Sequence, residues 1–302
     1  MNDTPQNRPP HHDTPSQDTH VPSRVFAPAR QDAETAKTGV STPQTENPSY
    51  RLAFQDMDFL LREDLRPVRF QLELLKPQLI LDEANIGSTF VMYGSARIPE
   101  PAKAQALLDR AEGETAIRIA QSLVEKSKYY TVAYELAQLV SAFPEDEEGK
   151  RQFVVCSGGG PSIMEAANRG AAEAGYDSVG LNIVLPHEQA PNPYVTPSLS
   201  MQFHYFALRK MHFLLHARAL AAFPGGFGTF DELFELLTLI QTGKIAPIPV
   251  LLYGRKFWDR VVNFEALVEE GVVSAKDLNI FTFVETAEEG WAVVKAFYRD
   301  KD

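Results

Sequence analysis

The sequence contains a single cysteine, Cys156, among its 302 residues. One cysteine cannot form an internal disulfide, and such sparse use is typical of a reducing compartment. No apolar run is long enough to cross a bilayer, and the N-terminus lacks the basic region followed by an apolar region that marks a secretory signal. We therefore expect a cytoplasmic protein with no membrane partner.

Positive charge is also scarce. The sequence holds 29 lysine and arginine residues against 40 aspartate and glutamate residues, which gives a formal net charge of −11. Proteins that bind nucleic-acid polymers gather lysine and arginine against the phosphates, so this balance argues against such a partner. It still allows a local basic pocket for a single phosphate. The 44% hydrophobic and 23% charged composition is that of a globular protein.

Large apolar residues are nearly missing from residues 1–48. This segment is instead rich in proline, threonine, glutamine, aspartate and asparagine, and it cannot bury enough apolar surface to offset the entropy of ordering. We expect a disordered tail over 1–48, followed by a single folded domain over 49–302. Three histidines lie in the tail, at His11, His12 and His20, and we expect them to be solvated rather than to bind a metal.

Two helices are predicted between the tail and the first strand. Residues 51–61 carry apolar side chains at helical spacing and predict an amphipathic helix. Pro67 suits the first turn of a second helix, which runs towards Ala84. This helical extension, residues 51–84, could cover an edge of the sheet or contact another subunit.

Apolar runs and helical patterns alternate from Ser88 onward. The alternation predicts an α/β fold with a Rossmann-like, doubly wound parallel sheet, preceded by the N-terminal helical extension. In such sheets ligands bind beyond the carboxyl ends of the strands, and the glycine clusters of this chain lie at such ends. The expected strands are 89–93, 153–156, 179–185, 219–223, 249–253 and 280–284. The expected helices are 101–125, 129–143, 161–175, 229–241, 256–270 and 287–298.

The first glycine cluster is Gly158–Gly160, between the strand at 153–156 and a helix with Pro161 in its first turn. Free N–H groups at a helix start, together with the helix dipole, form an anion site. The alternative is a tight turn that binds nothing. A dinucleotide fingerprint does not fit, because Ile163 stands where its third glycine would be, and the sequence has no Gly-Lys-Ser/Thr phosphate loop.

The second cluster again joins a strand to a helix. Its glycines, Gly225, Gly226 and Gly228, let backbone N–H groups converge on an oxyanion. Thr229 can cap the helix and donate its hydroxyl to a phosphate. Glu232 follows three residues later, so both side chains can face one cavity. Alternatively, Glu232 partners Thr229 in a capping box.

A basic pair, Arg209-Lys210, precedes the second cluster in the chain. The planar guanidinium of Arg209 suits a phosphate or a carboxylate, although an arginine on a surface helix is the simpler alternative. His212 and His216 lie four residues apart, but without a third ligand nearby they do not predict a metal site.

Together these residues resemble the LONELY GUY family of cytokinin riboside 5′-monophosphate phosphoribohydrolases. The family motif Pro-Gly-Gly-x-Gly-Thr-x-x-Glu is matched in full by residues 224–232, and the family's Arg-Lys pair is matched by Arg209-Lys210.

The resemblance extends beyond these two motifs. The Gly158–Gly160 loop and the Gly94-Ser95 turn also match, so the resemblance covers roughly residues 88–255. The helical extension is similar to that of the longer bacterial branch. Members are often labelled lysine decarboxylases, but Lys210 lacks the surroundings expected of a pyridoxal phosphate site.

The resemblance implies hydrolysis of the N-glycosidic bond of an adenine-type nucleoside 5′-monophosphate, to free base and ribose 5-phosphate, without cofactor or metal. Cleavage builds positive charge on the ribose. A carboxylate near C1′, here Glu232, can stabilise that charge and deprotonate the attacking water. The resemblance implies that Arg209 is catalytic as well. AMP and isopentenyl-adenosine monophosphate are both candidate substrates.

The nucleotide-binding residues are implied in the same way. The glycine-rich stretch from Gly225 to Thr229, below called the Gly225–Thr229 loop, is expected to hold the 5′-phosphate. The role of Glu165 stays open: it could reach the ribose hydroxyls or add a favourable anion to the first turns of its helix. The expected binding residues are Ser95, Gly159, Gly160, Glu165, Lys210, Gly225, Gly226, Gly228 and Thr229.

Two non-catalytic functions are compatible with the same fold, namely a nucleotide sensor and a molybdenum-cofactor carrier. Either would keep the glycine loops but would not need Glu232, so the presence of this residue favours the enzyme. The family resemblance further implies a homodimer or a larger homo-oligomer.

Overall fold

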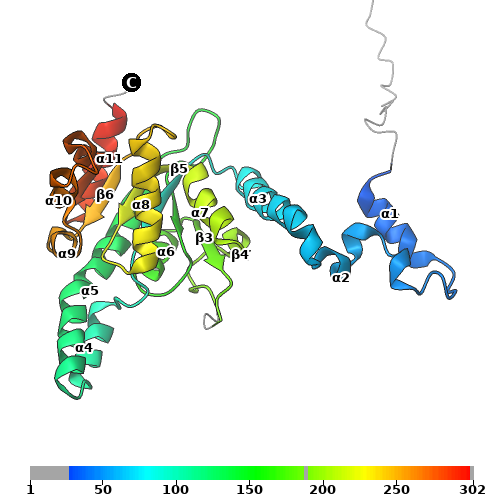
Figure 1. The fold of residues 1–302 in the computed structure, drawn as a ribbon, viewed down its shortest axis with the longest axis horizontal. Coiled ribbons are helices and arrows are strands. Elements are labelled where there is room, and N and C mark those ends of the chain that lie inside the picture. Colours follow the sequence, from blue (N-terminus) through cyan, green and yellow to red (C-terminus); the bar gives the residue numbers. More distant parts are fainter. Residues whose placement is uncertain (1–26, 187–189, 300–302) are drawn as a thin grey trace, which may run out of the picture. The chain divides into compact units, whose positions relative to one another are not determined.

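The computed structural model of the protein describes residues 27–186 and 190–299 (Figure 1). The described chain divides into two compact units between Arg66 and Pro67. Within the described ranges, no helix combines the length and the apolar character needed to cross a membrane.

In its described part, the first unit holds only short helices. These include α1 (Ala29–Thr35) and α2 (Met57–Leu60), and neither contains a buried residue. The amphipathic helix expected over 51–61 is thus reduced to α2, because a short helix without buried residues gains little stability from packing. The structure describes the predicted tail from residue 27 on, and α1 lies in this part of it. Its earlier part, including the three histidines, lies outside the described residues, and the domain boundary at 48/49 stays a prediction.

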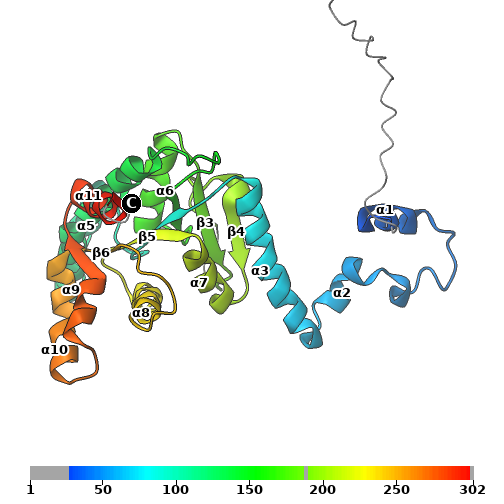
Figure 2. The same cartoon turned by 90° about the horizontal axis from the view of Figure 1, so that it is seen from above.

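The second unit is built on one sheet of seven parallel strands in the order β4-β3-β2-β1-β5-β6-β7 (Figures 1 and 2). The chain proceeds outward from β1 to β4, returns to the other side of β1 with β5, and proceeds outward again. This confirms the expected Rossmann-like, doubly wound fold. The strands are β1 (Thr89–Tyr93), β2 (Val154–Ser157), β3 (Ser178–Ile183), β4 (Ser200–Phe203), β5 (Ala217–Ala222), β6 (Val250–Tyr253) and β7 (Phe281–Val284).

The central strand is buried on both faces. Alternate residues of β1 point to opposite sides, with Phe90 and Met92 in one hydrophobic cluster and Val91 and Tyr93 in the other. All five residues of β1 are buried. A strand in this position reads as a continuous apolar run, which is why the sequence predicts it correctly.

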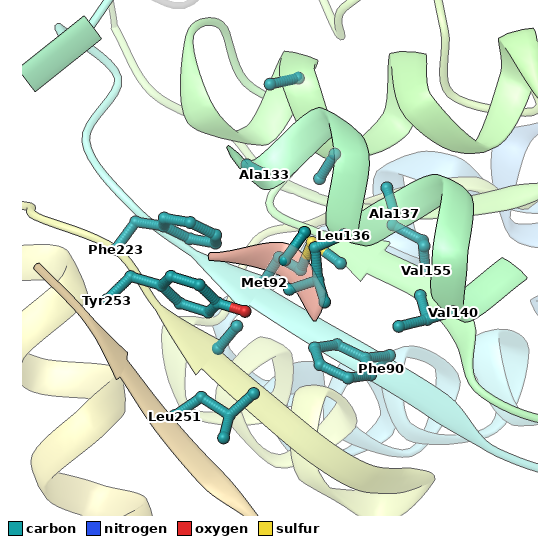
Figure 3. Packing of buried hydrophobic residues seen from close by; sticks show 14 of the residues in the cluster. Phe90, Met92, Ala133, Leu136, Ala137, Val140, Val155, Phe223, Leu251 and Tyr253 are labelled. Atoms are coloured by element: carbon teal, nitrogen blue, oxygen red, sulfur yellow. The ribbon is translucent and has the colours of Figure 1, made fainter. Parts of the chain in front are cut away.

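Helices cover both faces of the sheet. The Phe90 side is covered by α5 (Glu114–Ser141), α6 (Ile163–Glu173) and α11 (Ala287–Arg299), and Figure 3 shows Leu136 and Val140 of α5 packed there. The Val91 side receives residues from α3 (Arg66–Glu83), α7 (Phe206–Leu215), α8 (Phe227–Gln241), α9 (Arg255–Val261) and α10 (Phe264–Glu269). A further helix, α4 (Pro101–Asp109), precedes α5.

The long helix α5 differs from the expectation of two helices, 101–125 and 129–143. The first of these splits into α4 and the start of α5, and the expected gap near Ser127 is helical. Ser127 is buried, and its hydroxyl donates to the carbonyl of Val124 at 2.8 Å, so the helix continues through it.

Two other elements also depart from the sequence patterns. No pattern predicts β4, a four-residue edge strand with polar residues at Ser200 and Gln202. The helix expected over 256–270 is divided into α9 and α10 at Asn263, whose side chain accepts from the N–H of Ala266 and caps α10.

The direction in which successive strands are added to the sheet reverses at β1, which pairs with β2 on one side and with β5 on the other. Ligands in open α/β sheets bind at this kind of switch point, beyond the carboxyl ends of the strands. Both glycine clusters follow strands that flank β1.

Candidate active site

A cavity of about 890 Å³ lies beyond the carboxyl ends of β1, β3 and β5. Its volume is within the range of small-molecule sites. The predicted site residues that line it are Ser95, Arg209, Gly225, Gly226, Gly228, Thr229 and Glu232. Those that do not are Gly159, Gly160, Glu165 and Lys210.

The Gly225–Thr229 loop forms one wall of this main cavity. Helix α8 begins at Phe227, with Gly226 at the N-cap, so Thr229 is the third helical residue and not the cap that the sequence suggests. The first intrahelical bond runs from the N–H of Phe230 to the carbonyl of Gly226, at 3.1 Å. The N–H groups before Phe230 therefore have no intrahelical acceptor, and the positive end of the helix dipole lies at the cavity.

The three glycines of this loop differ in their surroundings. A methyl group on Gly225 would come within 2.2 Å of the hydroxyl oxygen of Thr229, so the threonine packs directly on the glycine backbone. A methyl group on Gly226 or Gly228 would meet no atom within 4 Å. These two glycines therefore border open space in the cavity wall, where a ligand can approach the backbone closely.

Arg209 and Glu232 form an ion pair inside the cavity. Nη1 of Arg209 donates to Oε1 of Glu232 at 3.2 Å, and the two side chains are 11% and 13% exposed. Nε of the same arginine donates to the carbonyl of Leu181 at 2.6 Å, and the guanidinium lies 5.0 Å from the ring centroid of Phe213. Arg209 is therefore a fixed, buried group, and Glu232 is bound to it rather than to Thr229 in a capping box.

Burial raises the pKa of Glu232 to about 7, against the opposing effect of Arg209, while the neighbouring Asp231 adds to the rise. A carboxyl group with this pKa exchanges a proton readily at neutral pH. A buried carboxyl that titrates there, beside a fixed cation in a cavity, has the properties of a general acid or base.

The Gly158–Gly160 loop contributes to the cavity through Gly158 only. A methyl group on Gly158 would come within 2.6 Å of Nη2 of Arg209, so this glycine makes room for the guanidinium. Gly159 packs against Asn182, and the carbonyl of Gly160 accepts from the side chain of Asn192 at 3.0 Å. The structure therefore gives Gly159 and Gly160 partners inside the protein, away from the cavity lining.

Glu165 and Lys210 also have partners outside the cavity lining. Glu165 accepts from the hydroxyl of Tyr130 on α5 at 3.0 Å. Lys210 pairs with Asp231 at 3.0 Å and with Glu235 at 2.9 Å. Glu165 lies in the first turn of α6, where its negative charge is favourable, as one of its two expected roles requires. The roles of Glu165 and Lys210 in nucleotide binding stay predictions.

The two histidines of α7 take part in helix packing. Nε2 of His212 lies 3.1 Å from the carbonyl of Glu73, and Nε2 of His216 lies 3.0 Å from the side-chain oxygen of Gln78, both on α3. Within the described ranges, no group of three or more histidine, cysteine, aspartate or glutamate side chains could hold a metal ion.

The structure adds cavity residues that the motifs do not reveal. Tyr93, at the carboxyl end of β1, lines the cavity, and burial together with the charge of Glu232 raises its pKa well above the usual value. Phe206 and Phe227 also line it, and Phe227 is 96% exposed. The rule that ligands bind beyond strand ends could have identified Tyr93, whereas nothing in the sequence marks the two phenylalanines.

Comparison with known proteins places this chain in a family. A family model described as possible lysine decarboxylase matches residues 164–294. The Arabidopsis thaliana protein named cytokinin riboside 5′-monophosphate phosphoribohydrolase LOG2 is 30% identical over 154 residues, which cover 50% of this chain and 67% of the relative. The chain belongs to the LONELY GUY family. This confirms the resemblance seen in the motifs.

Two other relatives are matched over smaller shares of their own length. A rice protein named probable cytokinin riboside 5′-monophosphate phosphoribohydrolase LOG4 is 28% identical over 139 residues, 45% of this chain and 59% of the relative. The pyrimidine/purine nucleotide 5′-monophosphate nucleosidase of Escherichia coli K12 is 32% identical over 118 residues, 36% of this chain and 26% of the relative. The chain thus has distant homology to phosphoribohydrolases and nucleosidases of nucleotide 5′-monophosphates.

Proposed function

We propose that the protein hydrolyses the N-glycosidic bond of an adenine-type nucleoside 5′-monophosphate, releasing the free base and ribose 5-phosphate. The observation that carries this proposal is the pair of Glu232 and Arg209, held in the same cavity as the Gly225–Thr229 loop. A buried carboxyl beside an anion-binding helix start is what this reaction requires.

The phosphate end of the substrate suits the Gly225–Thr229 loop. Open backbone at Gly226 and Gly228 and the hydroxyl of Thr229 supply hydrogen-bond donors, and the helix dipole favours negative charge there. Ser95 lines the same cavity and its N–H donates to the carbonyl of Pro224, which joins the turn after β1 to the loop. Binding at the phosphate orients the ribose towards Glu232.

The chemical step uses the carboxylate form of Glu232. As the bond between C1′ and the base nitrogen breaks, its electron pair leaves with the base, and positive charge develops on the ribose. Water adds to C1′ through its oxygen and passes a proton to Glu232, while the leaving base takes up a proton from solvent. Glu232 then returns its proton to solvent, which restores the carboxylate. Arg209 contributes by holding the carboxylate in position through Nη1 and by its own fixation to Leu181.

Two further observations support the proposal. Apolar side chains such as Ile183, Leu185 and Phe206 line the cavity, and they suit the faces of a purine and an apolar substituent on it. The relatives named above include enzymes named for cytokinin riboside 5′-monophosphate and for purine nucleotide 5′-monophosphate.

The test measures the release of free base from AMP and from isopentenyl-adenosine monophosphate. Replacing Glu232 with glutamine should lower the rate by about 10³-fold, in the range expected for the loss of a general base, while AMP binding survives. Asp231→Asn is a matched control, since it removes a neighbouring exposed carboxylate of α8, and it should keep most of the activity. Tight AMP binding by the wild type without base release would contradict the enzyme and favour the sensor or the molybdenum-cofactor carrier.

A homo-oligomer is part of the same proposal. Helix α3 exposes Leu72, Leu75 and Leu79, each more than half, at a spacing that places them on one helix face. An uncovered apolar face of this kind is typical of a subunit contact. The molar mass in solution, measured by light scattering, tests this expectation.

A further inference from the structure

A second cavity, of about 620 Å³, adjoins the main cavity. The two have five lining residues in common, which are Ser95, Arg97, Gly225, Gly226 and Phe257. Gly225 and Gly226 begin the loop on which the proposed function places the 5′-phosphate. The second cavity therefore lies next to the position of that phosphate.

Four basic side chains line the second cavity, which we call the basic cleft. They are Arg97 from the turn after β1, Arg118 and Lys126 from α5, and Arg260 from α9. The whole chain has a net charge of −11, so a convergence of four cations from three segments stands out against its average surface. Such a concentration of positive charge favours an anionic ligand.

Three of these cations have no ion-pair partner among the residues that the structure describes. Among the described residues, no ion pair involves Arg97, Arg118 or Arg260. Glu125 also lines the cleft, but its carboxylate is bound by Lys256. The fork of an unpaired arginine has donors free for a phosphate oxygen.

Lys126 shows that the positive charges lie close together. Its amine donates to the carbonyl of Ser122 at 3.2 Å. Burial lowers the pKa of Lys126, with Glu125 opposing and Arg260 adding to the fall. Like charges at this proximity repel one another, and a bound anion relieves that repulsion.

We propose that the basic cleft binds the second and third phosphate groups of a nucleoside 5′-di- or triphosphate whose first phosphate and nucleoside occupy the main cavity. This inference rests on the proposed function, because it takes the first phosphate to lie on the Gly225–Thr229 loop. Each added phosphate brings negative charge and acceptor oxygens to the arginine side chains of the cleft. Nucleoside polyphosphates then compete with the monophosphate for the main cavity.

The test compares the affinities of AMP, ADP and ATP, measured by calorimetry without divalent cations. For the wild type, we expect ATP to bind at least about tenfold more tightly than AMP, because charge-assisted hydrogen bonds are added. The double variant Arg118→Ala/Arg260→Ala should bring this ratio to about one, since both arginines line the basic cleft and not the main cavity. Arg97 stays unchanged because it lines both.

Arg255→Ala is the matched control. Arg255 lies on α9 like Arg260 but lines neither cavity, so its loss should leave the ratio of ATP to AMP affinity as in the wild type. Equal affinities for AMP and ATP in the wild type would overturn the inference. So would a preference for ATP that survives in the double variant.

Two further readouts separate the sources of failure. If the proposed function fails while the inference holds, ATP binds more tightly than AMP but no base is released from AMP. If inorganic tripolyphosphate binds tightly and ATP shows no advantage over AMP, the cleft takes free polyphosphate, and the nucleotide form of the inference is overturned.

Discussion

The two glycine loops look alike in the sequence but differ in their surroundings. Each follows a strand next to β1 and leads into a helix. In the Gly158–Gly160 loop, Gly159 faces the side chain of Asn182 and Gly160 is bonded to Asn192. In the Gly225–Thr229 loop, Gly226 and Gly228 face open space in a cavity wall.

The difference shows that glycine has two separate uses after a strand. The first loop uses it for close packing within the protein, and only Gly158 gives space to a site residue, Arg209. The second loop uses it to leave the backbone accessible from the cavity. Substitutions that add one methyl group should therefore affect stability in the first loop and binding in the second.

The largest expected effect on stability is that of Gly159→Ala. Gly159 has a φ of +72°, and a methyl group there would lie 2.2 Å from Oδ1 of Asn182. Asn182 donates to the carbonyl of Met201 at 3.1 Å, so moving it breaks existing hydrogen bonds. We expect a loss of about 3 kcal/mol in the free energy of unfolding, from backbone strain and lost hydrogen bonds. Urea denaturation measures it, and a loss below about 1 kcal/mol would remove the distinction between the loops.

On α8, the helix after the second loop, the ionised form of the proposed catalytic Glu232 should lower the free energy of unfolding. The folded-state pKa of Glu232, about 7, lies above the ordinary value of 4.5, so the folded protein binds the extra proton between these pH values. The contribution of this bound proton to the free energy of unfolding is fully present below pH 4.5 and is lost as the pH rises through 7. Glu232→Gln should therefore gain up to about 3 kcal/mol relative to the wild type at pH 8 and nothing at pH 4.

Urea denaturation of both proteins at the two pH values measures this change. The same pKa predicts that kcat/KM falls as the pH drops below about 7, because the carboxylate is the active form. If kcat/KM instead fell only near pH 4.5, the ordinary pKa of a glutamate, this would contradict a pKa of Glu232 that is raised by burial.

Gly228→Ala tests the expectation that an added methyl group in the second loop affects binding and does not lower stability. A methyl group there meets no protein atom within 4 Å, and the residue is in the first turn of α8, so stability should rise by about 0.5 kcal/mol. The same methyl group enters the space proposed for the phosphate, and AMP affinity should fall about tenfold. Calorimetric titration with AMP, with adenosine as the control ligand, checks whether the loss depends on the phosphate.

A smaller effect than that of Gly159→Ala is expected at Ser162, next to the first loop. Ser162 is a non-glycine residue with φ +65° and ψ −118°, at the N-cap of α6. This conformation is costly for a residue with a Cβ, so Ser162→Gly should stabilise the protein by about 1 kcal/mol. Thermal unfolding tests this. Unchanged or lower stability would mean that the serine side chain has a compensating contact.

The sequence predicts what local patterns encode and no more. The motif at 224–232 identifies the second loop, and continuous apolar runs identify strands such as β1. The different surroundings of the two loops depend on Asn182 and Asn192, which the fold brings to the first loop from more than 20 residues further along the chain. Contacts of this kind have no periodicity or spacing in the sequence, so they appear only with the fold.

The pairing of the proposed catalytic residues is another such contact. Arg209 and Glu232 belong to different helices, and the bond from Arg209 to the carbonyl of Leu181 comes from a third element, β3. The sequence at 209–210 predicts a basic pair, but it does not indicate that the two side chains have different surroundings. Arg209 lies in the cavity, while Lys210 binds Asp231 and Glu235 outside its lining.

The strand order has a consequence for the protein during its synthesis. β1 to β4 form one wing of the sheet, and both members of the Arg209–Glu232 pair come later in the chain. A nascent chain that has emerged from the ribosome only as far as Phe203 therefore carries a complete wing, with the Leu181 carbonyl in it, but neither charge of the pair. The lining of the main cavity is therefore complete only once the chain has been synthesised as far as Val261.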